Sequence, residues 1–124
     1  MTKDKLVTLT RKEVLERLAE TKDFRDFDIR KANLIKIDFS DCDLRGTNFS
    51  YSNLKDCSFR NCDMRATSLW NANLEGADFT NANLEDADLD YAKLRGAILY
   101  RANIRRASLP TELIPREDIT PSRT

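Results

Sequence analysis

Large apolar residues recur at every fifth position of this chain over most of its length. The eighteen positions are Phe24, Ile29, Leu34, Phe39, Leu44, Phe49, Leu54, Phe59, Met64, Leu69, Leu74, Phe79, Leu84, Leu89, Leu94, Leu99, Ile104 and Leu109. The residue two places before each of them is usually small, and from Ala72 to Ala107 it is always alanine. Only 40% of the chain is hydrophobic, so composition alone does not explain an unbroken run.

A period of five matches neither an α-helix nor an extended strand, whose side-chain periods are about 3.6 and 2 residues. Within each unit, however, the small and the large position are two residues apart, so both side chains can point to the same side of a strand. The other three residues face outward and include a corner. Each unit is therefore predicted to be one short side of a coil that stacks on the next coil, because a unit this small cannot bury its own apolar face.

The units resemble those of the pentapeptide-repeat family, whose pattern A(D/N)LXX is matched by Ala72–Gly76 (ANLEG) and Ala82–Asp86 (ANLED). The resemblance covers residues 22–109 and implies an all-β fold, a right-handed quadrilateral β-helix (a β-solenoid) with twenty residues per turn. Eighteen units would then make about four and a half coils. The four sides of the coil come from the resemblance, since the spacing alone does not give their number.

The N-terminal residues are predicted to cap this coil, because the end coils of a stack expose unpaired backbone. Thr10 and Glu13 have the spacing of a capping box. The residues that follow contain an apolar stripe at helical spacing, made of Val14, Leu15, Leu18 and Ala19. We therefore expect a short helix over residues 11–20, within an N-terminal helical cap of residues 1–21.

Both ends of the array depart from the repeat. Phe27 and Ile37 replace the small residue of their units, which predicts a first coil padded against the cap. Residues 110–124 contain prolines that stop strand pairing and are predicted to form a C-terminal cap and loose tail. In that segment Leu113 and Ile114 are expected to fold back on the last coil.

The residue types argue against catalysis. The chain has no histidine, which removes the commonest general base and the commonest metal ligand. It also lacks a glycine-rich phosphate loop and a setting that would activate a nucleophile. The asparagines and aspartates before the large positions recur throughout, so they belong to the repeat. We therefore expect no enzyme activity, cofactor, metal or small-molecule substrate.

Charge gives little attraction to nucleic acid or membranes, because 21 basic and 21 acidic residues cancel. The chain has no run of about 18 apolar residues for a membrane span, and its first residues lack the apolar stretch of a signal peptide. A cytoplasmic location without a membrane is expected.

The charge is nevertheless unevenly distributed along the chain: residues 66–92 hold six acids and no cation, and residues 93–106 hold five cations and no anion. The ordinary interpretation is a solvated surface. The alternatives are a cation site among the acidic residues and direct nucleic-acid binding through residues 93–106.

Residues twenty apart should form columns on the surface of the coil. An arginine column (Arg25, Arg45, Arg65) would lie beside an aspartate column (Asp23, Asp43, Asp63), either as a recognition strip or as a charge ladder of weak exposed pairs. An asparagine column (Asn33, Asn53, Asn73) is expected to hydrogen-bond across coils or to corner backbone.

Cys42 and Cys62 are also twenty apart, and a coil rise of about 4.8 Å would bring them within disulfide range. They are either a redox pair or small apolar fillers. The second interpretation is favoured, because both positions face the core and a reducing compartment is expected. Cys57 falls on another side and should be equally inert.

Three large aromatic residues occupy outward positions on one side of the coil: Tyr51, Trp70 and Tyr91. Tyr51 and Tyr91 share a column with Asn71 between them, and Trp70 lies in the next column. We predict that these four residues are either a patch for a protein partner or for self-association, or a set of rings that stiffens the stack. Two further apolar residues break the outward rule, Ile98 and Tyr100, where the C-terminal tail is expected to cover them.

These features predict a non-catalytic protein-interaction or scaffold module, because stacked repeats provide rigid faces for protein contacts. The resemblance implies an alternative, a DNA-mimic regulator or inhibitor of DNA gyrase. Relatives with that activity are longer, dimeric and strongly acidic, whereas this chain is neutral and carries a basic end.

Overall fold

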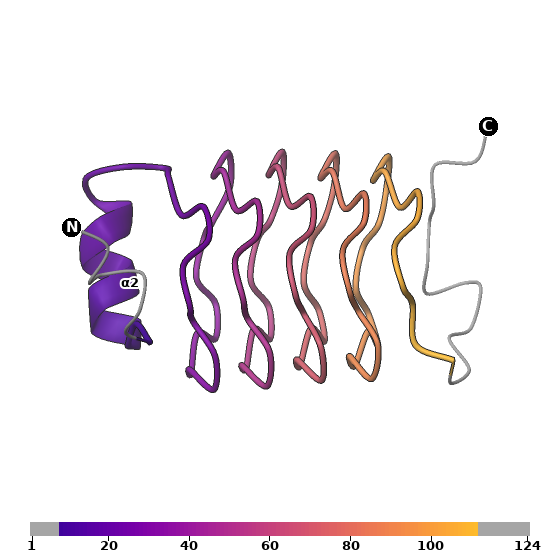
Figure 1. The fold of residues 1–124 in the computed structure, drawn as a ribbon, viewed down its shortest axis with the longest axis horizontal. Coiled ribbons are helices and arrows are strands. Elements are labelled where there is room, and N and C mark those ends of the chain that lie inside the picture. The colour runs from indigo at the N-terminus through magenta and orange to yellow at the C-terminus, as the bar shows by residue number, and fades with distance from the viewer. Residues whose placement is uncertain (1–7, 112–124) are drawn as a thin grey trace.

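The five-residue units form the sides of a regular coil in the computed structural model, which describes residues 8–111. Parallel β-bridges join residues twenty apart, from Asp23 and Asp43 at one end to Asp88 and Ser108 at the other. Because each unit has five residues, four units complete one turn, and the coil is quadrilateral. The turns stack along one axis, with helix α2 at the N-terminal end of the stack (Figure 1).

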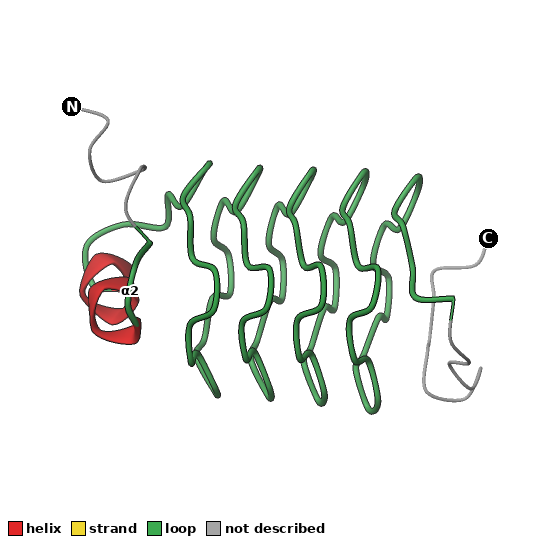
Figure 2. Ribbon diagram, turned by 60° about the horizontal axis from the view of Figure 1, so that its bottom comes forward, coloured by secondary structure: helices red, strands yellow, loops and turns green. Residues whose placement is uncertain are grey.

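Each side of the coil pairs with the coils before and after it. The amide of Leu44 donates to the carbonyl of Asp63 at 2.8 Å, and the amide of Asp63 donates to the carbonyl of Cys42 at 3.1 Å. The same pattern recurs from unit to unit, but each side is a single bridge and not a longer strand. The coils are therefore drawn as loops in Figure 2, where helix α2 stands apart in red.

The corners are tight turns that force the backbone into the left-handed region. In one of them the amide of Thr47 donates to the carbonyl of Leu44 at 3.1 Å, and Gly46 has φ 69°. Positive φ at the third residue is the mark of a type II turn, which favours glycine. In the described residues the same position is more often filled by another residue: Asp26, Lys31, Lys36, Asp41, Tyr51, Asp56, Asn61, Ala66, Asn71, Asn81, Asp86, Tyr91, Arg101 and Arg106. In the interior coils, pairing with the coils before and after each corner over-determines this strained conformation.

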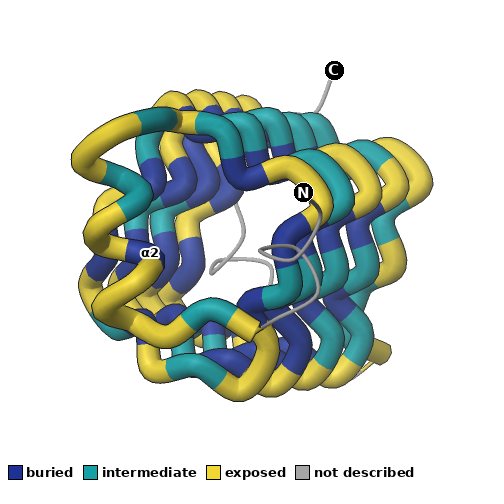
Figure 3. The backbone as a smooth tube through the Cα atoms, turned by 60° about the vertical axis from the view of Figure 1, so that its left-hand side comes forward, coloured by how far each residue is buried: buried dark blue, intermediate teal, exposed yellow. Residues whose placement is uncertain are grey.

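The core follows the predicted inward positions. Every fifth large residue from Phe24 to Leu99 is buried, while Ile104 and Leu109 at the last coil are partly buried. Figure 3 shows the buried positions repeating in register from coil to coil around the axis, with exposed positions at the corners. A column of phenylalanines stacks face to face inside, with ring centroids 5.4 Å apart (Phe39 and Phe59) and 5.1 Å apart (Phe59 and Phe79).

Polar residues at the small inward positions are satisfied by the coil before them. The hydroxyls of Thr47, Ser52 and Thr67 donate to backbone carbonyls 23 residues earlier, at 2.6, 2.6 and 2.8 Å. In the described residues no buried side-chain nitrogen or oxygen lacks a partner. A hydroxyl at this position therefore adds an interior bond between successive coils, and this bond offsets the cost of removing the hydroxyl from water.

Helix α2 spans Arg11–Leu18 and begins with the predicted capping box. The amide of Glu13 donates to Oγ1 of Thr10 at 3.2 Å, and the amide of Thr10 donates to Oε1 of Glu13 at 2.8 Å. Two bonds thus satisfy amides that would otherwise be unpaired at the helix start.

The apolar stripe predicted for this helix is wrong in part. Val14 is buried and Leu18 is partly buried, but Leu15 is 45% exposed and Ala19 is also exposed. On a helix Leu15 lies about a quarter-turn away from Val14, and residues three and four after Val14 share its face. A helix this short buries only that narrow face.

Arg17, three residues after Val14, joins the helix to the first coil. Its guanidinium carbon lies 4.4 Å from the ring centroid of Phe27, and its Nε donates to the carbonyl of Asp23 at 2.8 Å. Phe27 and Ile37 are both buried, so the first coils are padded as the sequence predicts.

The fold-back of Leu113 and Ile114 and the tail after them lie outside the described residues. In the described part Ile98 and Tyr100 are 44% and 48% exposed. Between residues 8 and 111 no helix has the length and apolar character needed to cross a bilayer.

Candidate functional site

The three outward aromatic rings lie in contact along one edge of the coil, and we call them the aromatic ladder (Tyr51, Trp70, Tyr91). The centroid of the Trp70 ring lies 5.2 Å from that of Tyr51 and 5.4 Å from that of Tyr91, with interplanar angles of 73° and 74°. Trp70 is partly buried, whereas Tyr51 is 50% and Tyr91 66% exposed. The indole thus bridges two tyrosines that keep much of their surface in water.

The corner conformation explains why these rings reach outward. Tyr51 and Tyr91 have φ of 63° and 62°, and Asn71 between them has φ 58°. The amide of Tyr51 donates to the carbonyl of Trp70 at 3.0 Å, so the backbone of the ladder is tied from coil to coil. The sequence places Asn71 between the tyrosines; the structure shows that the ring between them belongs to Trp70.

Beside Tyr91 lies a small hollow that the sequence did not indicate as part of the patch. It has a volume of about 110 Å³ and is lined by Asp90, Tyr91, Pro110 and Thr111. The carbonyl of Asp90 accepts from the amide of Asn71 at 2.9 Å, and its carboxylate accepts from the hydroxyl of Ser108 at 3.3 Å. Asp90 is twenty residues after Trp70, so the rule that residues twenty apart share a column could have placed Asp90 beside the aromatic ladder.

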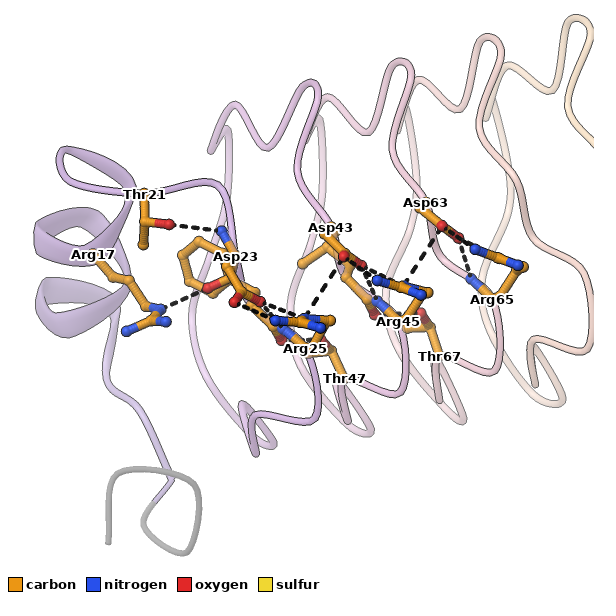
Figure 4. Close-up of polar contacts among 12 residues, drawn as sticks. Arg17, Thr21, Asp23, Arg25, Asp43, Arg45, Thr47, Asp63, Arg65 and Thr67 are labelled. Atoms are coloured by element: carbon orange, nitrogen blue, oxygen red, sulfur yellow. Dashed lines mark hydrogen bonds and ion pairs between the residues drawn. The ribbon is translucent and has the colours of Figure 1, made fainter. Parts of the chain in front are cut away.

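The predicted arginine and aspartate columns form a continuous charge ladder (Figure 4). Nη2 of Arg45 lies 2.6 Å from Oδ2 of Asp43, and its Nε lies 3.6 Å from Oδ2 of Asp63 in the next coil. The hydrogen bond from Arg45 holds the pKa of Asp43 below its ordinary value. Arg25 contacts Asp23 and Asp43 in the same way. These side chains are 31–51% exposed, so each pair contributes only about 0–1 kcal/mol. The strip is neutral, and a charge ladder accounts for it.

The asparagine column bonds to corner backbone, which is one of its two predicted roles. The side-chain oxygens of Asn33, Asn53 and Asn73 accept from amides two residues later, at 3.4, 3.2 and 3.0 Å. A bond between coils occurs in a different column, where Nδ2 of Asn103 donates to Oδ1 of Asn83 at 3.1 Å. The side-chain oxygens of Asn33, Asn53 and Asn73 therefore hold the turns.

The three cysteines are free and buried. Burial raises the pKa of Cys42 to about 11 and those of Cys57 and Cys62 to about 12. The thiols of Cys57 and Cys62 donate to the carbonyls of Leu34 and Phe39, both at 2.9 Å. They occupy the same place as the hydroxyls of the threonines and serine described above, which supports the role of small fillers.

The thiols are therefore expected to react slowly with a maleimide or a disulfide reagent in the native protein at pH 8. The thiolate is the reactive form, and at these pKa values on the order of one thiol in a thousand or fewer is ionised. Counting modified sites by mass spectrometry should give a slow native reaction and a fast reaction of all three after denaturation. Fast native labelling, or a Cys42–Cys62 bridge in protein purified without air, would restore the redox interpretation.

The acidic and basic bands contact each other at the C-terminal part of the stack. Nε of Arg106 lies 2.9 Å from Oδ1 of Asp86, and its Nη2 contacts Glu85. The hydrogen bond from Arg106 lowers the pKa of Asp86. Within residues 8–111 no group of three or more potential metal ligands is close enough to hold an ion.

A family model described as "Pentapeptide repeat region" matches residues 32–109. Among solved structures, a pentapeptide repeat protein from Nostoc PCC 7120 is 24% identical with a TM-score of 0.56, over 86% of this chain and 90% of that one. A pentapeptide repeat protein of the Arabidopsis thaliana thylakoid lumen is 27% identical with a TM-score of 0.49, over 82% of this chain and 74% of that one. No curated protein is a significant match.

HetL, a pentapeptide repeat protein involved in heterocyst differentiation regulation in Nostoc sp. strain PCC 7120, is 25% identical with a TM-score of 0.41. The match covers 89% of this chain but only 50% of HetL. The similarity to the Nostoc PCC 7120 protein with a TM-score of 0.56 shows a shared fold only.

Proposed function

Because this chain belongs to the pentapeptide-repeat family, whose model matches residues 32–109, we propose that it is a non-catalytic protein-interaction or scaffold module. We propose further that the aromatic ladder, together with the neighbouring Asn71, is the surface that binds a protein partner. The exposure of its two tyrosines carries this proposal, since the repeat places polar residues at most outward positions.

Exposed aromatic rings on a rigid support suit a binding surface. They bury a large area at low cost in side-chain entropy, and such residues dominate measured hot spots. The alternative is that the rings only stiffen the stack. Ring-to-ring contact with Trp70 is explained by stiffening, but the 66% exposure of Tyr91 is not, because that area contributes nothing to packing.

Replacing Trp70 by alanine is expected to leave the protein folded and to abolish association. The variant removes the ring that joins the two tyrosines, while the core beneath stays intact. The measurement is a pull-down from the native host with quantitative mass spectrometry, together with sedimentation to detect self-association. Melting curves by circular dichroism establish that the variant is folded.

The matched control is Tyr100→Ala, which removes another half-exposed aromatic ring, 48% exposed, outside the aromatic ladder. It should retain every association of the unchanged protein. Loss of stability in Trp70→Ala with all associations retained would refute the binding proposal and leave the stiffening role.

We propose that the coil domain spans residues 22–109 as about four and a half right-handed coils, closed at its start by α2. The bridges twenty residues apart and the buried Val14 support this arrangement. A cytoplasmic location is proposed as well, since the three cysteines form no disulfide framework of the kind that small secreted domains use.

The alternative, a DNA-mimic regulator of gyrase, has weaker support. A mimic of duplex DNA needs a continuous acidic surface, whereas in this chain the acidic band is followed by five cations, one of which pairs with Glu85 and Asp86.

A further inference from the structure

We infer that the hollow beside Tyr91 accepts an arginine side chain of the partner protein, stacked on the tyrosine ring and paired with the carboxylate of Asp90. This inference rests on the proposed function, and it names the chemistry that the aromatic ladder recognises. Its occupant is a segment of a separate protein that carries at least one arginine.

The residues that line the hollow suit an arginine side chain, which can contact an aromatic ring, a carboxylate and an apolar surface at once. Tyr91 offers a ring that is 66% exposed, and a cation within about 6 Å of a ring centroid is attracted by its face. Asp90 and Pro110 also line the hollow, so its lining residues include one carboxylate and one apolar ring that could contact the methylene stem. The Trp70 ring contacts the Tyr91 ring edge to face with their centroids 5.4 Å apart, so the Tyr91 ring is positioned before a ligand arrives.

The carboxylates at this edge are not neutralised within the described chain. In residues 8–111, neither Asp88 nor Asp90 forms an ion pair, and their polar contacts are with backbone amide and hydroxyl groups. Arg106, by contrast, is occupied by Asp86 and Glu85. The ladder thus adjoins uncompensated negative charge, which is complementary to a cationic partner and disfavours an acidic one.

Arginine fits better than lysine. Its planar guanidinium can stack on the ring while its fork donates two bonds to a carboxylate, whereas an ammonium is a compact, strongly hydrated charge. The chain itself twice places a guanidinium over an aromatic ring. Arg17 lies 4.4 Å from the ring centroid of Phe27, and Arg101 lies 5.4 Å from that of Tyr100.

The single tryptophan of the chain lies in the ladder and reports on its occupancy. The full-length protein is titrated with the capped peptide Gly-Arg-Gly-Arg-Gly, and Trp70 emission is recorded. We expect a saturable change in emission at low salt. Binding should be at least severalfold weaker when both arginines of the peptide are replaced by lysine, and absent when both are replaced by glutamate. Asp90→Asn should weaken binding about tenfold, the value of a charge-assisted bond. Glu75→Gln, a carboxylate in another column and without an ion pair in the described structure, should bind as the unchanged protein does.

The inference would be overturned if millimolar arginine peptide gave no saturable change. It would be overturned equally if Asp90→Asn bound the arginine peptide as tightly as the unchanged protein does, or if the glutamate peptide bound as tightly as the arginine peptide. A dimer in sedimentation that Asp90→Asn dissolves without peptide would also overturn it, because the occupant would then be a second copy. The proposed function is tested separately. A partner lost by Trp70→Ala but retained by Asp90→Asn would refute the arginine and leave the binding surface standing.

Discussion

Replacing Leu74 by aspartate is expected to unfold the protein. Leu74 is completely buried and belongs to a coil with neighbours on both sides: its amide donates to the carbonyl of Lys93, and its unit pairs with the coil before it. An aspartate there would place an unpaired carboxyl group in an apolar interior, at a cost of several kcal/mol whether it stays charged or takes up a proton. That is a large share of a total stability of about 5–15 kcal/mol.

The measurement is thermal and urea unfolding followed by circular dichroism. Glu75→Ala, at the next residue, is the control and should change the free energy of unfolding by less than about 0.5 kcal/mol, because Glu75 points outward and forms no ion pair in the described structure. Comparable effects from the two substitutions would show that the inward and outward assignment is wrong.

Replacing Phe59 by alanine is expected to lower the free energy of unfolding by about 3–5 kcal/mol. Phe59 is completely buried and stacked between Phe39 and Phe79, and it also meets the edge of Phe49 at 6.1 Å. The substitution removes the ring and leaves a cavity that the paired coils cannot close, since the backbone bonds fix their spacing. Because each coil contacts only its neighbours, the stack cannot redistribute the loss.

Urea unfolding checks this value, and Phe59→Leu is the control. Leucine already occupies many equivalent positions, so this variant should lose clearly less than the alanine variant. A loss below about 1 kcal/mol for Phe59→Ala would mean that the phenylalanine column is not a principal support of the stack.

Sequence and structure disagree at the N-terminal helix, and at the aromatic ladder the structure adds what the sequence could not give. The apolar stripe predicted Leu15 as a buried residue, but it is 45% exposed, since a helix resting on the end of a coil contacts it along one narrow line. For the ladder, the column rule placed the four residues side by side but could not orient their rings. The ring of Trp70 lies between the tyrosines because its side chain crosses from its own column into theirs, which depends on side-chain angles and not on spacing.

The sequence by itself determined which side of each unit faces inward. Small and large residues two apart fix that choice locally, because strand side chains alternate. Only the tertiary structure decided the corners and the hollow. Non-glycine residues such as Tyr51 and Asn71 take positive φ, a conformation that their own preferences oppose and that pairing with the coils before and after them enforces. The hollow joins Asp90 and Tyr91 to Pro110 and Thr111, about one coil further along. These residues lie side by side only in the folded coil, because the stacking of one coil on the next brings them together and their local sequence does not.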